Sequence, residues 1–165
     1  MSTQAAGDPL AYRKALGCFV TGVAIVSVDG AEGVTAMTVN SFSSVSLEPR
    51  LILWSLDDRS DRRAAFLSAT AFGVSILSFA QQAQSQICAE PGGGWWRGAV
   101  ERLAEGGAPV LPEALARFDC RTLERIRAGD HTILLGAVAA FDARDGDGLT
   151  FFRGRYGRAV QERLG

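Results

Sequence analysis

The sequence predicts a mainly β protein with short helices, in which a mostly antiparallel sheet closes into a barrel. Six or seven runs rich in β-branched and aromatic residues occur along the 165 residues, and neighbouring runs are joined mostly by turns and not by crossover helices. No GxGxxG follows the first run, which argues against a dinucleotide-binding Rossmann unit. A chain of this length is expected to form a single domain, residues 1–165, with residues 1–8 as a flexible N-terminus.

The N-terminal third predicts one helix and one hairpin. Within residues 7–22, Asp8 is the expected N-cap and Pro9 suits the first helical position. Apolar residues recur there at helical spacing, and Gly22 is expected to end the segment. A hairpin is expected to follow up to Val39, with its turn at the dipeptide Asp29-Gly30.

The middle of the chain predicts two further strands, residues 50–56 and 71–78. A short helix is expected between them over residues 60–69, with Ser60 as its cap. A second short helix is expected over residues 79–90, and residues 91–98, PGGGWWRG, are expected to form a loop.

The C-terminal part predicts three strands and a final helix. Residues 117–130 contain an alternation typical of a half-buried strand, and residues 131–144 form the next apolar run, with a bulge expected at Gly136. The last strand is expected over residues 148–154, and residues 157–164 are expected to be helical.

Composition restricts the class of protein. Apolar residues make up 47% of the chain and charged residues 21%, and the net charge is −1, which argues against nucleic-acid binding. Three separated cysteines without CxxC or Cys/His spacing predict neither a zinc site nor a disulfide framework, so the reducing cytoplasm is the expected compartment. The N-terminus has no apolar core of the signal-peptide type, and the longest apolar runs are too short to span a membrane.

Residues 33–49, GVTAMTVNSFSSVSLEP, combine seven polar side chains with no charge before Glu48. Ser and Thr favour turns and strands, so the segment can be an ordinary polar connection. It can also be a cradle in which hydroxyls, an amide and backbone N–H groups donate to ribityl hydroxyls, heterocycle carbonyls or a phosphate. Such donors beside an apolar strand suit a flat heterocycle with a polar tail.

Residues 55–63, SLDDRSDRR, admit two similar interpretations. The segment can be a solvated, charged loop before a helix. Alternatively, Ser60 at the helix start, with Arg59, Arg62 and Arg63 beside it, can bind a phosphate. The second interpretation would extend the cradle toward the phosphate end of the same ligand.

The only histidine, His131, precedes an apolar strand. A lone histidine is usually structural or exposed, and neither a metal site nor a catalytic triad is indicated around it, although at a barrel rim it can touch a ligand. Residues 150–158 contain Arg153, Arg155, Tyr156 and Arg158. They form either a surface strand end or a cationic and aromatic wall for a second, anionic ligand.

Five motifs in order give the chain a family resemblance, which extends from about Tyr12 to Arg158. It resembles the short-chain flavin reductases, the reductase components of two-component flavin-dependent monooxygenases. The motifs are RxALGxFxTGV (Arg13–Val23), GxTAxTxNSFxSVSLxP (Gly33–Pro49), SLxxxS (Ser55–Ser60), GDH (Gly129–His131) and FRGRYG (Phe152–Gly157). The sequence departs from the family pattern at Trp95 and Trp96, and at Arg62, where the family often has Thr.

The resemblance implies a split, Greek-key type β-barrel homodimer that binds FMN or FAD near the dimer interface. It implies reduction of the flavin by NADH or NADPH and delivery of reduced flavin to a partner monooxygenase. The implied flavin-binding residues are Ala36, Met37 and Thr38 (isoalloxazine edge), Asn40 and Ser41 (ribityl chain and pyrophosphate), Ser55, Leu56 and Asp57 (ring or ribityl), and Ser60 and Arg62 (phosphate). The implied nucleotide-binding residues are His131, near the nicotinamide, and Arg153 and Tyr156.

Two other functions share the same cradle: a flavin-binding module without reductase activity, and an oxidase with a tightly bound flavin. The GDH and FRGRYG motifs favour a second, nucleotide-sized substrate and therefore the reductase. His131 is expected to position the nicotinamide and not to act as an obligatory acid or base. The sequence does not distinguish FMN from FAD, or NADH from NADPH.

Overall fold

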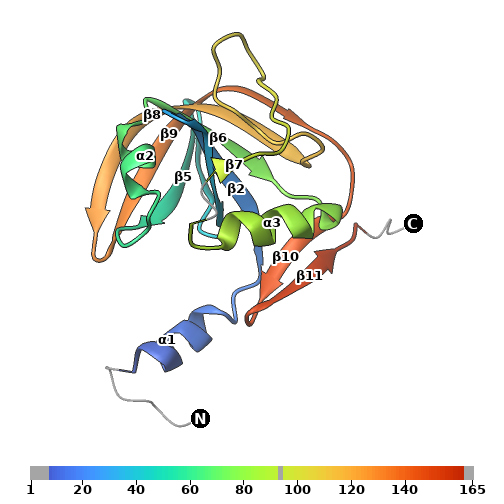
Figure 1. Cartoon of the computed structure of the whole chain (residues 1–165). Coiled ribbons are helices and arrows are strands. Elements are labelled where there is room, and N and C mark those ends of the chain that lie inside the picture. The colour runs from blue at the N-terminus through green and yellow to red at the C-terminus, as the bar shows by residue number, and fades with distance from the viewer. Residues whose placement is uncertain (1–7, 93–94, 162–165) are drawn as a thin grey trace.

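The structure is a computed structural model that describes residues 8–92 and 95–161; the expectation of a flexible N-terminus falls mainly on residues outside this part. Its strands form two antiparallel sheets (Figure 1). The eight-stranded sheet has the order β4-β5-β9-β8-β6-β2-β3-β7 and the three-stranded sheet the order β1-β10-β11. The mainly β, antiparallel architecture expected from the sequence is therefore confirmed.

The strands are β1 (Thr21–Gly22), β2 (Ala24–Gly30), β3 (Gly33–Val39), β4 (Ser43–Leu47), β5 (Arg50–Asp57), β6 (Ala71–Ile76), β7 (Trp95–Trp96), β8 (Ala116–Ala128), β9 (His131–Ala143), β10 (Gly148–Phe152) and β11 (Arg155–Ala159). The helices are α1 (Pro9–Leu16), α2 (Arg63–Ser68), the 3-10 turn η1 (Phe79–Gln81) and α3 (Gln82–Ala89). None of the helices in the described part is both long and apolar enough to cross a membrane.

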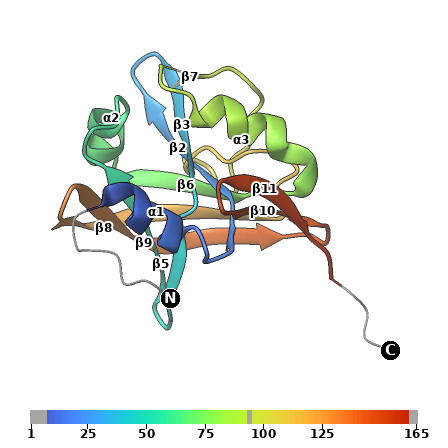
Figure 2. The ribbon, with the colours of Figure 1, turned by 90° about the horizontal axis from the view of Figure 1, so that it is seen from below.

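Strand β2 lies between two hydrophobic clusters, which explains its unbroken apolar sequence. Val26 and Val28 pack with Trp54 and Phe72 in one cluster, whereas Ile25 packs in the other with α3 and β10 residues. The strand is buried on both faces over Ala24–Val28. Helices α2 and α3 lie on either side of the β2–β3 hairpin in both views (Figures 1 and 2).

The first helix is shorter than predicted. Asp8 caps it as expected, accepting a hydrogen bond from the Leu10 amide at 2.9 Å. It ends at Gly17, however, whose carbonyl accepts a hydrogen bond from the Arg153 amide. The chain is thereby led to the second sheet, and Thr21–Gly22 forms β1 against β10 and not the end of a helix.

The β2–β3 hairpin is present, but its turn lies two residues later than predicted. Gly30 pairs with Gly33, so Ala31 and Glu32 form the turn and Asp29 belongs to the strand. The carboxylate of Asp29 pairs with Arg102. This long-range ion pair is compatible with Asp29 in a strand position and is not visible in the local sequence.

The connection after β3 contains a strand that the sequence analysis missed, β4, which pairs with β5. The predicted helix over residues 60–69 is α2, which begins only at Arg63, and Ser60 is not its cap. Ser60 instead forms a turn before the helix, in which its carbonyl accepts from the Arg63 amide. The predicted helix over residues 79–90 is divided into η1 and α3.

The predicted strands 117–130 and 131–144 are confirmed as β8 and β9, with register irregularities in place of a bulge centred on Gly136. Gly136 pairs with Thr122, next to the register shift between Thr122 and Glu124, and a Cβ atom there would lie 2.5 Å from the Phe72 ring. The predicted terminal helix is wrong where it is described, because residues 155–159 form β11; residues 162–164 lie outside the described part. The predicted loop 91–98 contains the short strand β7.

Candidate functional site

A polar cavity of about 520 Å³ lies where β3, the β5–α2 loop and the end of α3 meet. It is lined by Met37 and Thr38, by residues 57 and 59–62, and by residues 89–91. Five residues predicted from the sequence therefore come together here: Met37, Thr38, Asp57, Ser60 and Arg62. We call this the central cavity.

The charges of the central cavity are arranged around Asp57. Arg59 holds this carboxylate through its backbone amide at 2.9 Å and its guanidinium at 3.1 and 2.9 Å, and these hydrogen bonds lower the pKa of Asp57 to about 2. The Arg59 side chain is 72% exposed. The hydroxyl of Ser60 accepts from the Arg62 amide and contacts the Met37 sulfur at 3.6 Å. The lining of the cavity therefore carries two guanidiniums and three carboxylates, and its solvent-facing loop presents the Ser60 hydroxyl beside the Arg59–Asp57 ion pair.

The position of Arg62 differs from the one expected of a phosphate-binding residue. The residue is only 6% exposed, and its guanidinium donates to the carbonyls of Cys88 and Glu90 at the end of α3. Its neighbour Asp61 accepts from the Gly92 amide at 2.7 Å. Arg62 and Asp61 thus fasten the β5–α2 loop to the segment after α3, and they form the wall of the cavity.

A smaller cavity of about 200 Å³ continues from the central one, with Thr38 and Ala89 lining both. We call it the aromatic cavity, because Phe151 and Tyr156 line it with their rings in edge-to-face contact at 5.5 Å. Asn40, an exposed residue, lies on its rim. Of the predicted residues, Thr38, Asn40 and Tyr156 meet here.

Ser85 fixes both sides of the aromatic cavity. Its hydroxyl lies 2.8 Å from the Tyr156 hydroxyl, and its carbonyl accepts from the Thr38 hydroxyl at 2.6 Å. Ser85 is fully buried in α3, far in sequence from both partners. Its role cannot be predicted from the sequence, since nothing in the helix pattern distinguishes this serine from a surface residue.

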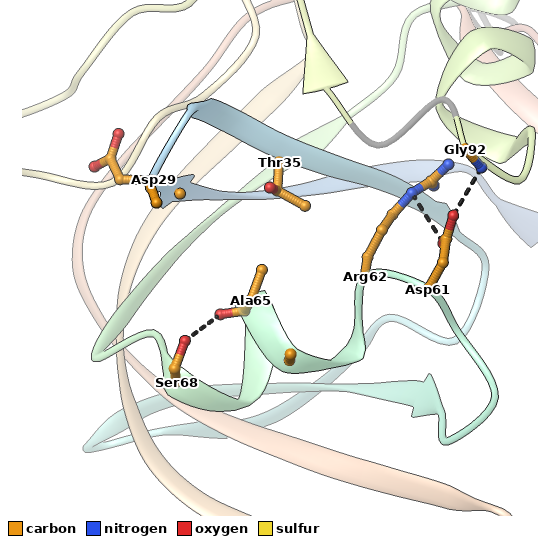
Figure 3. Close-up of a pocket in the computed structure, with 10 residues that line it drawn as sticks. Asp29, Thr35, Asp61, Arg62, Ala65, Ser68 and Gly92 are labelled. Carbon is orange, nitrogen blue, oxygen red and sulfur yellow. Dashed lines mark hydrogen bonds and ion pairs between the residues drawn. The ribbon is translucent and has the colours of Figure 1, made fainter.

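A third cavity, of about 630 Å³, adjoins the central cavity on its other side, and Asp61 and Arg62 line both. Figure 3 shows it between the β2–β3 hairpin and α2, with Thr35 on the strand opposite Ala65 on the helix. The three cavities are thus linked by shared wall residues, with the polar one in the middle.

Four predicted flavin-binding residues lie outside the cavity walls. Leu56 is fully buried in the first hydrophobic cluster and Ala36 is 1% exposed in the second. Their side chains therefore serve the core. The hydroxyl of Ser41 accepts from the Ser55 amide at 2.9 Å and lies 3.2 Å from the Ser55 carbonyl, to which it donates. This clamp joins the segment after β3 to β5.

His131 lies at the start of β9, where it is the register partner of Asp57. Its Nδ1 atom is 2.8 Å from the Asp130 carboxylate, and its side chain is 40% exposed. The hydrogen bond to His131 lowers the pKa of Asp130. The structure thus brings His131 beside the central cavity on an exposed hairpin end.

Arg153 lies away from the three cavities. It occupies the turn between β10 and β11, contacts Cys18 at 3.6 Å, and lines a separate cavity with α1. Within one chain, the structure therefore does not bring Arg153 together with Tyr156 at the aromatic cavity.

Comparison with known proteins identifies the family. The family model of the flavin reductase like domain matches residues 16–159 of this chain. The chain belongs to this family. It is 44% identical over 151 residues to the FMN reductase (NADH) SmoA of Agrobacterium fabrum, a match that covers 89% of this chain and 84% of SmoA. The reductase component of the flavin-dependent trigonelline monooxygenase of Acinetobacter baylyi is 37% identical over 145 residues.

That second match covers 87% of this chain but 47% of the Acinetobacter protein, so the chain spans about half the length of that relative. Among solved structures, the NADH:FAD oxidoreductase SgcE6 of Streptomyces globisporus C-1027, in complex with NAD and FAD fragments, superposes with a TM-score of 0.90. It is 29% identical, and the match covers 99% of both chains. The fold described above is therefore that of flavin reductases.

Proposed function

We propose that this flavin reductase family member transfers a hydride from NADH or NADPH to FMN or FAD and supplies reduced flavin to a partner monooxygenase. The observation that carries the proposal is the pair of adjoining cavities, aromatic on one side of Thr38 and polar on the other. An aromatic compartment suits a flat heterocycle, and a polar one suits a ribityl phosphate. The named reductases among its relatives support the same activity.

The residues present fit a flavin. Tyr156 and Phe151 offer an aromatic wall, and the amide of Asn40 lies at its edge. At the polar end, Arg59 and Ser60 supply a guanidinium and a hydroxyl, which suit a phosphate. The flavin, when bound, supplies the hydride-accepting chemistry. The protein's task is to hold the flavin and the nicotinamide in contact and to exclude competing orientations.

His131 is proposed to position the nicotinamide. It lies beside the central cavity through its pairing with Asp57, on an exposed hairpin where a second ligand can approach. Hydride transfer itself requires no titrating side chain. His131→Ala is therefore expected to raise the KM for the pyridine nucleotide more than it lowers kcat. A large loss of kcat at unchanged KM would contradict this role.

The protein is proposed to act as a cytoplasmic homodimer with a monooxygenase partner. Helix α1 has no buried residue in one chain, and Leu10, Leu16 and Phe19 are each more than half exposed. A second copy of the chain would cover such a surface. The three free cysteines suit a reducing compartment. The relative named as a reductase component supports an oxygenase as the acceptor of reduced flavin.

The test is oxidation of NADH and NADPH by the purified protein, with and without added FMN or FAD. A rate that rises with free flavin and saturates is expected, because the flavin is a substrate that leaves. Flavin binding without nucleotide oxidation would favour the flavin-binding module. Turnover that does not respond to added flavin would favour an oxidase with a tightly bound flavin.

A further inference from the structure

Ser85 of α3 lies behind the aromatic cavity and connects two residues that line it. It is fully buried and is not itself among the lining residues. Its hydroxyl lies 2.8 Å from the Tyr156 hydroxyl of β11, and its carbonyl accepts from the Thr38 hydroxyl of β3 at 2.6 Å. One buried residue therefore determines the hydrogen bonding of two hydroxyl groups from the wall of the same cavity.

The burial of Ser85 decides which hydroxyl donates in its pair with Tyr156. Among the described residues, the Tyr156 oxygen is the only hydrogen-bond partner of the Ser85 hydroxyl. If the tyrosine donated, the serine proton would be buried without an acceptor, which carries the full desolvation penalty of that group. Tyr156 is only half-buried, so its own proton can turn toward the cavity or water. The serine therefore donates, and the Tyr156 proton is free for a ligand.

The hydrogen bond from Thr38 has the opposite consequence. Its hydroxyl proton is taken up by the Ser85 carbonyl, so toward the cavity its oxygen can only accept. Through Ser85, the aromatic cavity thus has a donor at Tyr156 and an acceptor at Thr38. A ring whose edge carries a carbonyl oxygen beside an N–H group complements this pair.

The ring of Tyr156 is held in place independently of Ser85. It packs edge to face against Phe151, with the ring centroids 5.5 Å apart and the planes at 67°. The two residues are register partners on β11 and β10, and both pack against the second hydrophobic cluster. Loss of the Ser85 hydroxyl should therefore leave the ring in place and release only the direction of its proton.

We propose that Ser85 is a positioning residue, which directs the Tyr156 hydroxyl as a hydrogen-bond donor toward a ring ligand in the aromatic cavity. The ligand is recognised by a carbonyl acceptor next to an N–H donor. Two groups of the proposed reaction carry such an edge, the imide of the flavin ring and the carboxamide of the nicotinamide. The inference rests on the proposed function for these ligands and does not depend on hydride transfer itself.

The test is a double-mutant cycle of Ser85→Ala, Tyr156→Phe and the double variant. Each substitution removes one hydroxyl, and alanine suits a helix interior. Ser27→Ala is the matched control, because Ser27 is also fully buried, makes one hydrogen bond of 2.6 Å to the Pro109 carbonyl, and lines none of the three cavities. Thermal unfolding checks that each variant folds.

Two constants are measured for each variant. The dissociation constant for riboflavin, from flavin fluorescence, reports on the ring without any phosphate contact. The KM for NADH at saturating flavin, with kcat, reports on the nicotinamide.

Ser85→Ala is expected to weaken the ligand of the aromatic cavity about fivefold, as for the loss of one hydrogen bond. A higher dissociation constant for riboflavin would identify the flavin ring as that ligand. A higher KM for NADH at unchanged kcat, with riboflavin binding unchanged, would identify the nicotinamide. The double variant should bind no more weakly than Tyr156→Phe, because the serine acts through the phenol, and Ser27→Ala should change neither constant.

Unchanged riboflavin binding together with unchanged KM in Ser85→Ala would overturn the proposal, as would losses that add in the double variant. If Ser85→Ala does not fold, Tyr156→Phe decides alone, since it leaves Ser85 in place: two unchanged constants would overturn the proposal. Absence of NADH oxidation by the wild type, with the riboflavin effect present, would remove the reductase and leave the role of Ser85. Flavin-stimulated oxidation that is the same in Ser85→Ala, with both constants unchanged, would leave only the reductase.

Discussion

The two edges of the β2–β3 hairpin differ in how closely they are packed. Toward β6 and β8, the backbone itself is in contact: a Cβ atom at Gly73 would lie 1.9 Å from the Pro109 carbonyl oxygen, and Ser27 donates to that same oxygen at 2.6 Å. Along β3, the opposite edge, the hairpin borders three connected cavities. The β2 edge is therefore closely packed, whereas the β3 edge faces the three cavities, which together we call the groove.

The walls of the groove are held in place by hydrogen bonds and not by close backbone packing. Hydrogen bonds from two buried residues, Arg62 and Ser85, join the segments that line the groove. Arg62 fixes the end of α3, and Ser85 fixes both Thr38 and Tyr156. Changes on the packed side should therefore reduce stability, whereas changes at the groove surface should reduce ligand binding with little effect on stability.

The largest effect is expected at Gly73 on the packed side. Gly73→Ala would place a methyl group into the Pro109 carbonyl and should destabilise the fold by about 3 kcal/mol or more, because backbone cannot yield as a side chain can. Chemical denaturation measures the change. Gly22→Ala is the matched control, since nothing lies within 4 Å of a Cβ atom there. Equal stability of the two variants would contradict the packing difference.

A smaller loss of stability is expected at Arg117, which lies near the start of β8 on the packed side. Its side chain is 8% exposed and pairs with Asp142, at 2.9 Å from Nε, and with Glu101. Arg117→Met should lower the unfolding free energy by about 1–2 kcal/mol, because two ion pairs are lost whose half-exposed carboxylates stay partly hydrated. Loss of flavin binding without loss of stability would place Arg117 in the site instead.

At the groove, Ser60→Ala should act on binding. We expect the KM for flavin to rise about fivefold to tenfold, since one hydroxyl contact to the phosphate is lost. The unfolding free energy should change by less than about 1 kcal/mol, because the hydroxyl makes only two long contacts, to the Arg62 amide and to the Met37 sulfur. Ser43→Ala, at an exposed serine outside the cavities, is the control. A stability loss with unchanged KM would assign Ser60 to the fold.

The smallest effect is expected from the pH dependence of Asp57. Its pKa is about 2 in the folded protein against 3.8 for the free group, so its ionised form stabilises the fold. This contribution is complete above about pH 4 and is lost as the pH falls toward 2. Asp57→Asn should therefore flatten the acid limb of the stability curve in that window. The side chain is 38% exposed, so the effect is small.

The sequence predicted the parts of the fold that depend on local pattern. Strands β5, β6, β8 and β9 alternate or run apolar over many residues, and all four were found. The short strand β1 was missed and β11 was taken for a helix, because their residues are held by pairing with β10. Such pairing depends on contacts between distant residues and leaves no local pattern.

The site was also predicted only in part, because contacts between distant parts of the chain place some of its residues. The hydroxyl-rich segment led to Thr38 and Asn40, which do line the groove. Arg62 was expected at a phosphate because arginine beside a helix start suits one. The fold directs it to two carbonyls at the end of α3, about 26 residues away in sequence. Ser85 could not be found at all, since its partners come from β3 and β11.

The most direct test of the central claim is a crystal structure of the protein with FAD bound. We expect the isoalloxazine at the aromatic cavity, near Tyr156, and the phosphates in the central cavity near Ser60. Flavin bound elsewhere on the chain, with the three cavities unchanged, would contradict the assignment of the groove to the flavin.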